Sequence, residues 1–304
     1  YTLYGGLRAS IFTDNIQFIV FVVLLLIAFS YLINFNANEF SFDFIKEKQA
    51  HLLSSSYLPN FTAGLTFFIA VAATNLFHQG NWQRVYAAKN NKVLKNSLII
   101  SFFIIIPIVF FMGFSGLVAV SADTVSVPDL AFFQLLLKDQ YVTISVIIIF
   151  LAISLTVSSI DTIINAISSL IIVDGKKIIK SKNYDLLSKQ IIIILSIIAL
   201  FVASKGLSIL YLFLLADLFC CAAVLSIFYG FYSKTFLEKN AYISIIIGLF
   251  AGLLLFPSPD FSKSILIGII FPANLFPSFV SQSLLFLSFL VATFIPLVAW
   301  KIKK

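Results

Sequence analysis

Uncharged apolar runs of roughly twenty residues recur along this chain from one end to the other. An α-helix rises 1.5 Å per residue, so about 20 apolar residues are needed to cross a hydrocarbon core roughly 30 Å thick. The composition agrees, because 61% of the residues are apolar and 11% are charged, whereas soluble domains average about 45–50% and 25%. We therefore expect an all-α polytopic membrane protein with about eight transmembrane helices. The candidate spans are residues 11–34, 61–79, 97–121, 143–173, 190–204, 206–232, 241–256 and 280–300.

The basic residues predict how these spans are oriented. If Tyr1 is cytoplasmic, three quarters of the 20 lysines and arginines fall on the cytoplasmic side, as the positive-inside rule requires. The net charge of +7 is then explained by topology and by anionic lipid of the inner leaflet, and it gives no indication of nucleic-acid binding. We expect a multi-pass integral protein of the bacterial inner (plasma) membrane. The basic residues left outside are Lys46, Lys48, Lys138, Lys205 and Lys263.

Two of the predicted outer loops have helical features. Residues 35–60 carry three acidic side chains and are expected to hold a short surface helix. Residues 123–141 include an apolar-periodic segment that predicts an amphipathic helix lying over the outer face. The sequence leaves open whether these helices cap an external vestibule or only connect the spans.

Few residues offer metal or redox chemistry. Cys220 and Cys221 are adjacent inside an apolar run, where they are expected to pack as small apolar residues. The two histidines, His51 and His78, complete no Cys/His set with metal-ligand spacing, which excludes a structural zinc site.

An enzyme motif is also present in the third predicted span. Gly113-Phe-Ser115-Gly116 resembles the nucleophile motif of rhomboid intramembrane proteases. Those proteases need a histidine base on a later span, and no histidine follows His78. We therefore expect no catalytic residue and no enzymatic activity, and we expect Gly113 and Gly116 to form a close helix-packing face.

Three carboxylates fall inside the predicted spans: Asp14, Asp161 and Asp217. Charged side chains are costly there, and no lysine or arginine is expected inside the spans to neutralise them. A carboxylate without a fixed cationic partner must be protonated, reach water or meet a mobile cation, and the last two are what an ion-coupled transporter needs. The alternatives are snorkelling to water from a span end and, for Asp217, a structural role capped by hydroxyls of a neighbouring helix.

Polar side chains form a stripe on the fourth span. At 3.6 residues per turn, Ser158, Asp161, Thr162 and Asn165 share one face, with Ser159 at its edge. A hard cation such as Na⁺ prefers oxygen ligands, which hydroxyls and a carboxylate at helical spacing supply. The alternative is that these hydroxyls bond to carbonyls one turn back or to a neighbouring helix.

Four segments of the chain resemble one family, the sodium:solute symporters. Residues 1–17, with Tyr-Thr-Leu-Tyr-Gly-Gly-Leu at their start, are similar to the signature that opens core helix five. Residues 74–89 resemble the end of core helix six, and residues 158–162 resemble the sodium-binding stretch of core helix eight. Residues 215–221 are similar to core helix ten, so the resemblance extends from the start of the chain to about Tyr232.

This resemblance implies a LeuT-type fold of two inverted five-helix repeats with sites near the membrane midplane. Residues 1–304 would form one transporter domain: 1–34 the last helix of the first repeat, 61–232 the second repeat, and 241–304 accessory C-terminal helices. We expect the chain to be a fragment without the N-terminal helices, including the core helix that supplies carbonyls to the main sodium site.

The resemblance also implies a main sodium site. Its ligands here would be the Leu155 carbonyl and the hydroxyls of Ser158 and Ser159. Na⁺ is the expected coupling ion, and neither a cofactor nor any other metal is expected.

A second cation site is implied by three further residues. Asp14 matches the family's helix-five aspartate, which lies beside the main site and completes a second site in some members. Asp161 and Thr162 match the other ligand positions, where several members carry two serines. The change to Asp161 leaves the number of coupled ions open.

The substrate pathway is implied by residues on core helices six and ten. Sugar carriers have a Tyr-Trp gate where this chain has Thr74 and Asn75, so a smaller polar solute such as urea, an amino acid or a small carboxylate is favoured. Asp217 lies near the place where a polar residue of related carriers bonds the substrate. Its carboxylate would favour a solute with an ammonium, amide or urea-like donor.

The expected function is therefore Na⁺-coupled symport of a small polar organic solute by alternating access. The expected partners are the solute, Na⁺ and membrane lipid. The main alternative is a channel or a non-transporting membrane subunit, although the sequence has no repeated pore motif or short selectivity filter. The sequence indicates neither the solute, nor the ion stoichiometry, nor the oligomeric state.

Overall fold

The computed structural model describes residues 2–35, 38–138, 141–180, 183–233, 238–261, 264, 266 and 283–301. Most of these residues are helical, and in this part of the chain the only β-pairing is an isolated bridge between Pro257 and Ser264. The helices divide into two compact units, Tyr1–Leu53 with Gln79–Ser204 and Ser54–His78 with Lys205–Lys304. The predicted all-α membrane fold is confirmed.

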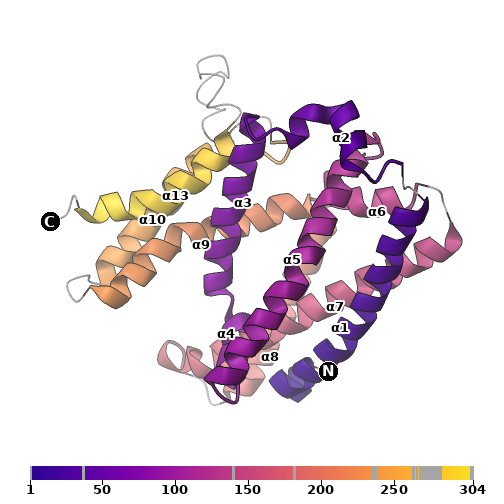
Figure 1. Ribbon diagram of the computed structural model, residues 1–304. Coiled ribbons are helices and arrows are strands. Elements are labelled where there is room, and N and C mark those ends of the chain that lie inside the picture. The colour runs from indigo at the N-terminus through magenta and orange to yellow at the C-terminus, as the bar shows by residue number, and fades with distance from the viewer. Residues whose placement is uncertain are drawn as a thin grey trace. The chain divides into compact units, whose positions relative to one another are not determined.

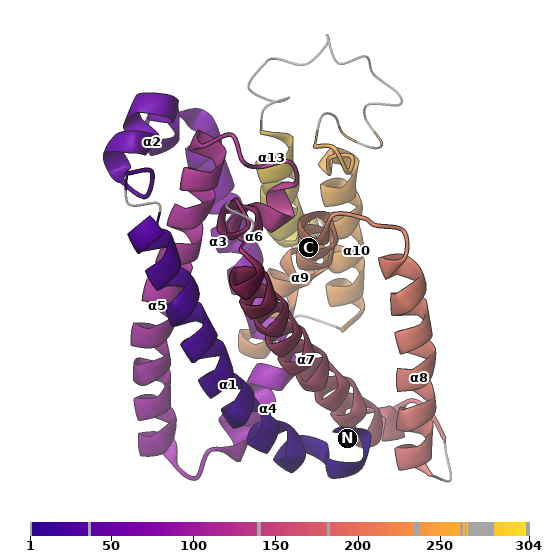
Figure 2. The ribbon, with the colours of Figure 1, turned by 90° about the vertical axis from the view of Figure 1, so that its right-hand side faces the viewer.

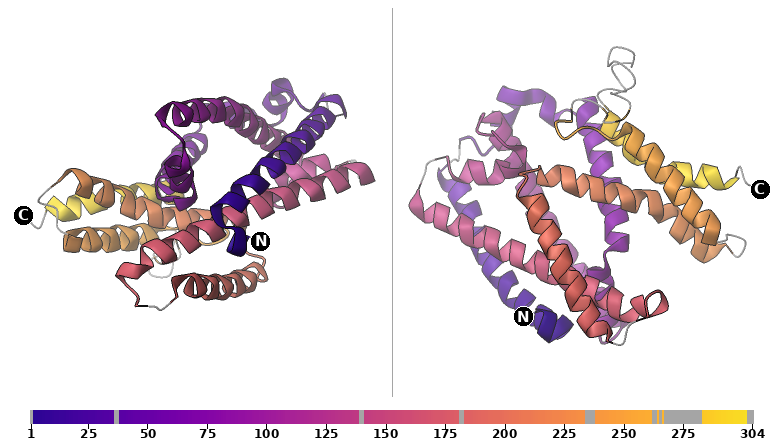
Figure 3. Two further views of the ribbon diagram at one scale, coloured as in Figure 1. Left: turned by 90° about the horizontal axis from the view of Figure 1, so that it is seen from below. Right: turned by 180° about the vertical axis from the view of Figure 1, so that it is seen from behind.

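The first unit is built around the packing of α1 against α7, two helices far apart in the chain that run side by side (Figures 2 and 3). α4 and α8 also pack on α7, and α5 packs on α2 and α6. Its apolar core contains Leu25, Leu32, Leu135 and Leu151. The helices of this unit are α1 (Thr2–Phe35), α2 (Phe42–Gln49), α4 (Gln79–Ala87), α5 (Asn91–Ser121), α6 (Ala131–Leu136), α7 (Val142–Val173) and α8 (Tyr184–Ala203), with short 3₁₀ turns at Ala50–Leu53, Pro128–Leu130 and Gly175–Lys177.

The second unit is a bundle in which α10 lies alongside α13 and both pack on α9 (Figure 1). α3 packs on α9 and α13. The core of this unit contains Leu214, Leu218, Phe256 and Phe289, all nearly inaccessible to solvent. Its helices are α3 (Leu58–Phe77), α9 (Ile209–Tyr232), α10 (Glu238–Leu255) and α13 (Leu284–Lys301).

Polar caps determine where several helices begin. The side chains of Ser41, Asn90, Asn183 and Ser208 accept hydrogen bonds from backbone N–H groups in the first turns of α2, α5, α8 and α9. These N–H groups have no partner within the helix, so a capping oxygen stabilises the start of each one. These four helices thus start at capping residues that can be recognised in the sequence.

Six of the predicted spans form helices long and apolar enough to cross a membrane: Leu7–Asn34, Leu58–Phe77, Asn91–Ser121, Val142–Lys177, Tyr184–Ala203 and Ile209–Tyr232. The last two predicted spans correspond to shorter apolar helices, Lys239–Leu255 and Leu284–Leu297, so the count of eight is not confirmed. The predicted start of the last span, 280–282, lies outside the described residues. Both predicted outer-loop helices are present, as α2 and α6.

The prediction for Gly113 and Gly116 is wrong. A Cβ added at either position would meet no atom of the described residues within 4 Å. Ser115 between them is fully buried and donates to the Phe111 carbonyl of its own helix at 2.7 Å. Within the described residues, α5 packs on α2 and α6 through other side chains, so these two glycines form no close helix contact.

Close glycine packing occurs instead between α10 and α13. A Cβ at Gly252 would lie 2.8 Å from the Ala292 Cβ and 3.3 Å from the Ser288 carbonyl oxygen. A Cβ at Gly248 would lie 2.9 Å from the Ala292 carbonyl oxygen. Ser288 Oγ donates to the Gly252 carbonyl at 2.8 Å, as small residues allow where two helix backbones approach closely.

We expect Gly252→Ala to lower the free energy of unfolding by about 1–3 kcal/mol, because the added methyl group overpacks a close contact. The control is Gly64→Ala on α3, where an added Cβ meets nothing within 4 Å. There the higher helix propensity of alanine should leave stability unchanged or raise it by up to about 1 kcal/mol. Denaturant unfolding in detergent micelles measures both, and equal effects at the two positions would contradict this packing.

Candidate functional site

A polar cluster forms in the first unit where α1, α4 and α7 meet. Its central contact joins Arg84 of α4 to Asp14 of α1, with 2.6 Å between Nη2 and Oδ2. The Arg84 and Asp14 side chains are 38% and 21% exposed, so the ion pair is only partly shielded from solvent. Arg84 Nη1 donates to the Gly80 carbonyl of its own helix at 3.1 Å.

The stripe predicted on α7 faces this ion pair. Ser158 Oγ donates to Asp14 Oδ1 at 3.1 Å, and Thr162 Oγ1 accepts from Arg84 Nη2 at 3.1 Å. The two hydroxyls lie one turn apart, so a single face of α7 supplies both contacts. The structure therefore brings together Asp14, Ser158 and Thr162, three of the predicted sodium-binding residues.

Asp161 lies in the same region and is almost fully buried, with 2% of its surface exposed. Its Oδ2 accepts from Thr13 Oγ1 at 3.1 Å, and Thr13 precedes Asp14 on α1. Asp14 of α1 thus contacts α7 through Ser158, and Asp161 of α7 contacts α1 through Thr13. Asp161 is positioned by tertiary contacts and does not snorkel to water.

Further polar groups surround the cluster. Gln83 Nε2 donates to the Asn165 carbonyl at 3.2 Å and ties α4 to the next turn of α7. The buried polar atoms of the described residues that have no hydrogen-bond partner include Ser10 Oγ and Gln17 Oε1 on α1, Gln83 Oε1 on α4 and Asn165 Nδ2 on α7. Buried polar atoms are usually satisfied, so the region retains hydrogen-bonding capacity for water or a ligand.

The other two predicted sodium-binding residues lie outside these contacts. Ser159 Oγ donates to the Leu155 carbonyl at 2.9 Å, which is the bond to the preceding turn that serines often make in apolar helices. Ser159 is exposed, and the Leu155 side chain is 38% exposed. Within the first unit, this edge of α7 is therefore separate from the face that contacts α1 and α4.

Sequence reasoning missed the role of Arg84. The expectation that no basic side chain neutralises the three acidic residues is wrong for Asp14, because Arg84 reaches it from a segment assigned to a cytoplasmic loop. Only His78 separates the last residue of α3, Phe77, from the first residue of α4, Gln79, and α4 packs on α7 within the first unit. A signal was present in the sequence, since Arg84 is one of only two arginines and lies in a segment already singled out.

A second site lies in the second unit, between α3 and α9. Thr74 Oγ1 donates to Asp217 Oδ1 at 2.5 Å. Asp217 is 8% exposed and lies among apolar residues of the core, including Leu214 and Leu218. The structure thus brings together two of the three residues predicted to line the substrate pathway.

Asn75, the third of these residues, points elsewhere. Its Nδ2 donates to the Val71 carbonyl on its own helix at 2.8 Å, and its side chain is exposed. Adjacent positions on a helix are about 100° apart, so Thr74 and Asn75 cannot both face α9.

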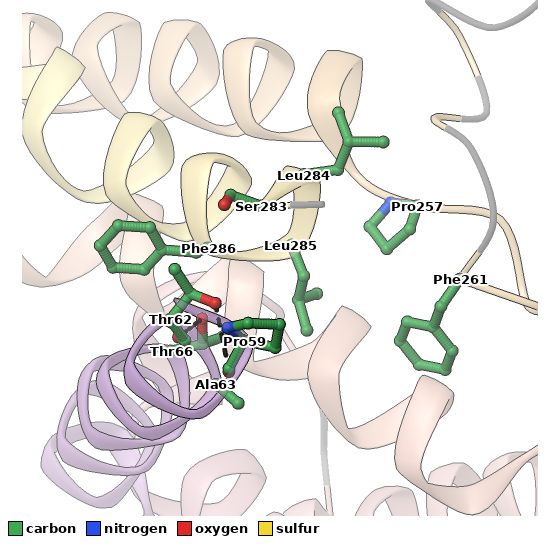
Figure 4. Close-up of a pocket in the computed structure, with 10 residues that line it drawn as sticks. All are labelled: Pro59, Thr62, Ala63, Thr66, Pro257, Phe261, Ser283, Leu284, Leu285 and Phe286. Carbon is green, nitrogen blue, oxygen red and sulfur yellow. Dashed lines mark hydrogen bonds between the residues drawn. The ribbon is translucent and has the colours of Figure 1, made fainter. Parts of the chain in front are cut away.

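The second unit also contains a pocket of about 240 Å³ (Figure 4). Four α3 residues and three α13 residues contribute to its lining, which is mainly apolar. The hydroxyls of Thr62 and Thr66 in this lining donate to carbonyls of their own helix. None of the predicted site residues lines this pocket, so it is distinct from the Thr74–Asp217 contact.

Comparison with known proteins gives two findings. The sequence model of the sodium:solute symporter family matches residues 1–248. The chain is also 29% identical over 234 residues to the spermidine transporter DUR31 of Candida albicans. That alignment covers 76% of this chain and 43% of the relative, so the chain spans less than half of the relative's length. No solved structure matches the chain.

We expect Thr74→Val to lower the free energy of unfolding by about 1–3 kcal/mol, because it removes the donor to a buried carboxylate and keeps the side-chain volume. The loss should be smaller when Asp217 is already leucine, since the acceptor is then absent. Thr66→Val on the same helix is the control and should have little effect. Denaturant unfolding of all four variants measures the coupling, and an equal cost of Thr74→Val in both backgrounds would exclude it.

Proposed function

The chain belongs to the sodium:solute symporter family, and from this premise we propose that it carries the ion and solute sites of a Na⁺-coupled symporter for a small polar solute. Family membership supports solute transport by a multi-pass membrane protein. The observation that carries the finer proposal is the set of oxygen ligands that α1 and α7 present to each other around Asp14. We place the protein in the plasma membrane.

The sodium part of the proposal rests on the chemistry of these oxygens. Na⁺ is a hard cation, and carboxylates, hydroxyls and backbone carbonyls are the ligands that such ions prefer. In the proposed main site, Leu155, Ser158 and Ser159 are the ligands, with rotation of the Ser159 hydroxyl away from the Leu155 carbonyl. In the proposed second site, Asp14, Asp161 and Thr162 are the ligands.

The solute part rests on Asp217. A carboxylate inside an apolar helix bundle is costly, and none of the ion pairs formed by the described residues involves Asp217. Its one described hydrogen bond, from Thr74, leaves acceptor capacity for a cargo. A solute with an ammonium, amide or urea-like donor matches this acceptor, and the matched spermidine transporter is consistent with a cationic amine.

The sodium proposal is tested by Ser158→Ala and Ser159→Ala in the protein expressed from its complete reading frame. Each removes one oxygen ligand, so each should raise the Na⁺ concentration for half-maximal uptake by about ten- to a hundredfold. Thr156→Val is the matched control, because its hydroxyl bonds only to the Ala152 carbonyl on the exposed side of α7. Unaltered Na⁺ dependence in both serine variants would refute this assignment.

The solute proposal is tested by Asp217→Asn in the same protein. Loss of the carboxylate charge should raise the apparent KM for a cationic amine such as spermidine by about tenfold or more, at unchanged abundance in the membrane. Asp185→Asn, on the exposed first turn of α8, controls for the general change in charge. If reduced abundance accounts for the whole loss of uptake, Asp217 has a structural role only.

A further inference from the structure

Arg84 already binds two of the oxygens assigned to the second cation site. Its Nη2 lies 2.6 Å from Asp14 Oδ2 and 3.1 Å from Thr162 Oγ1, so one nitrogen bridges the two ligands. Hard cations bind oxygens at about 2.3–2.6 Å. A cation bound to both of these oxygens would overlap the guanidinium nitrogen.

Electrostatics adds to this steric conflict. Arginine is always charged in proteins, so a cation beside Asp14 would meet a second positive charge at contact distance. Of the two carboxylates assigned to this site, Asp14 is already paired with Arg84, and Asp161 accepts a hydrogen bond from Thr13. A cation and the guanidinium therefore cannot both occupy the space between Asp14 and Thr162.

The surroundings of Arg84 also allow its guanidinium to move away from Asp14 and Thr162. Its side chain is 38% exposed, so water can solvate the guanidinium when it moves away. Its other terminal nitrogen, Nη1, bonds to the Gly80 carbonyl on the same short helix and does not depend on α1 or α7. Release thus requires a side-chain rotation and no unfolding of α4.

We propose that Arg84 is an internal competitor of the transported cation, which must displace its guanidinium from Asp14 and Thr162 in order to bind there. The inference rests on the proposed function, because it concerns the second of the two sodium sites. Arg84 then sets the Na⁺ concentration at which this site fills. Removal of the Arg84 guanidinium therefore strengthens Na⁺ binding.

The test is equilibrium binding of ²²Na⁺ to the purified full-length protein, measured by scintillation proximity. Arg84→Gln should lower the Na⁺ concentration for half-occupancy of the second site by about five- to tenfold. This is near the low end expected for a charged hydrogen bond, because the pair is partly exposed. Arg84→Lys keeps the charge but loses the planar bridge between the two oxygens, so it should give a smaller gain of about twofold. Arg8→Gln, the same change at an exposed position of α1, should have no effect.

Two further variants distinguish direct competition from a general charge effect. In Asp14→Asn/Arg84→Gln the gain should disappear, because the contested carboxylate is gone. A gain that persists in this double variant, or equal gains in Arg84→Gln and Arg8→Gln, overturns the proposal. Weaker Na⁺ binding in both Arg84→Gln and Arg84→Lys also overturns it and makes Arg84 a support for the site.

Failure of the proposed function gives a different result. If the wild-type protein shows no saturable ²²Na⁺ binding, or if Ser158→Ala leaves that binding unchanged, the sodium-site assignment itself is wrong. Saturable binding that Ser158→Ala weakens and Arg84→Gln leaves unchanged overturns only the role of Arg84.

Discussion

Both units depend on satisfying carboxylates within apolar helices. An aspartate at the centre of a membrane helix costs about 2.5–3.5 kcal/mol on insertion scales, and the cost falls only when another helix supplies a partner. Asp14 receives the guanidinium of Arg84 and the hydroxyl of Ser158, Asp161 receives the hydroxyl of Thr13, and Asp217 receives that of Thr74. Each of these contacts joins two helices, so the same groups that need partners also determine which helix faces pack together.

The two sites have different electrostatic character. Around Asp14, a carboxylate, a guanidinium and two hydroxyls form a network that several donors share. Such a network can rearrange, because a donor that leaves one oxygen can be replaced by water or by an ion. Asp217 has one described hydrogen bond, at Oδ1, in an apolar environment, so its Oδ2 keeps acceptor capacity. In the function that we propose, the first arrangement exchanges small cations, and the second contacts one donor group of a solute.

Much of the fold and part of the site could be predicted. Apolar runs defined the spans, and the spacing of Ser158, Asp161, Thr162 and Asn165 correctly placed a polar stripe on α7. The motif resemblance identified Thr74 and Asp217, which the structure then brought within 2.5 Å of each other. The contact between Arg84 and Asp14 could not be predicted from local pattern, because it joins residues 70 positions apart and depends on the packing of both α1 and α4 on α7. The packing role of Gly113 and Gly116 was assigned wrongly, since glycine spacing alone does not say whether another helix lies opposite.

The sequence by itself determined that the chain crosses a membrane as helices, where several of these helices begin, and which polar residues share a helical face. These properties depend on hydropathy, capping and the 3.6-residue period, all of which are local. Only the tertiary structure decided which face of each helix meets another. Three features depend on side-chain contacts between segments distant in the chain. They are the pairing among Thr13, Asp14, Arg84 and α7, the separation of Asn75 from Asp217, and the close approach of α10 to α13 at Gly252. Such contacts depend on packing and desolvation across the whole unit. A short stretch of sequence does not contain that information.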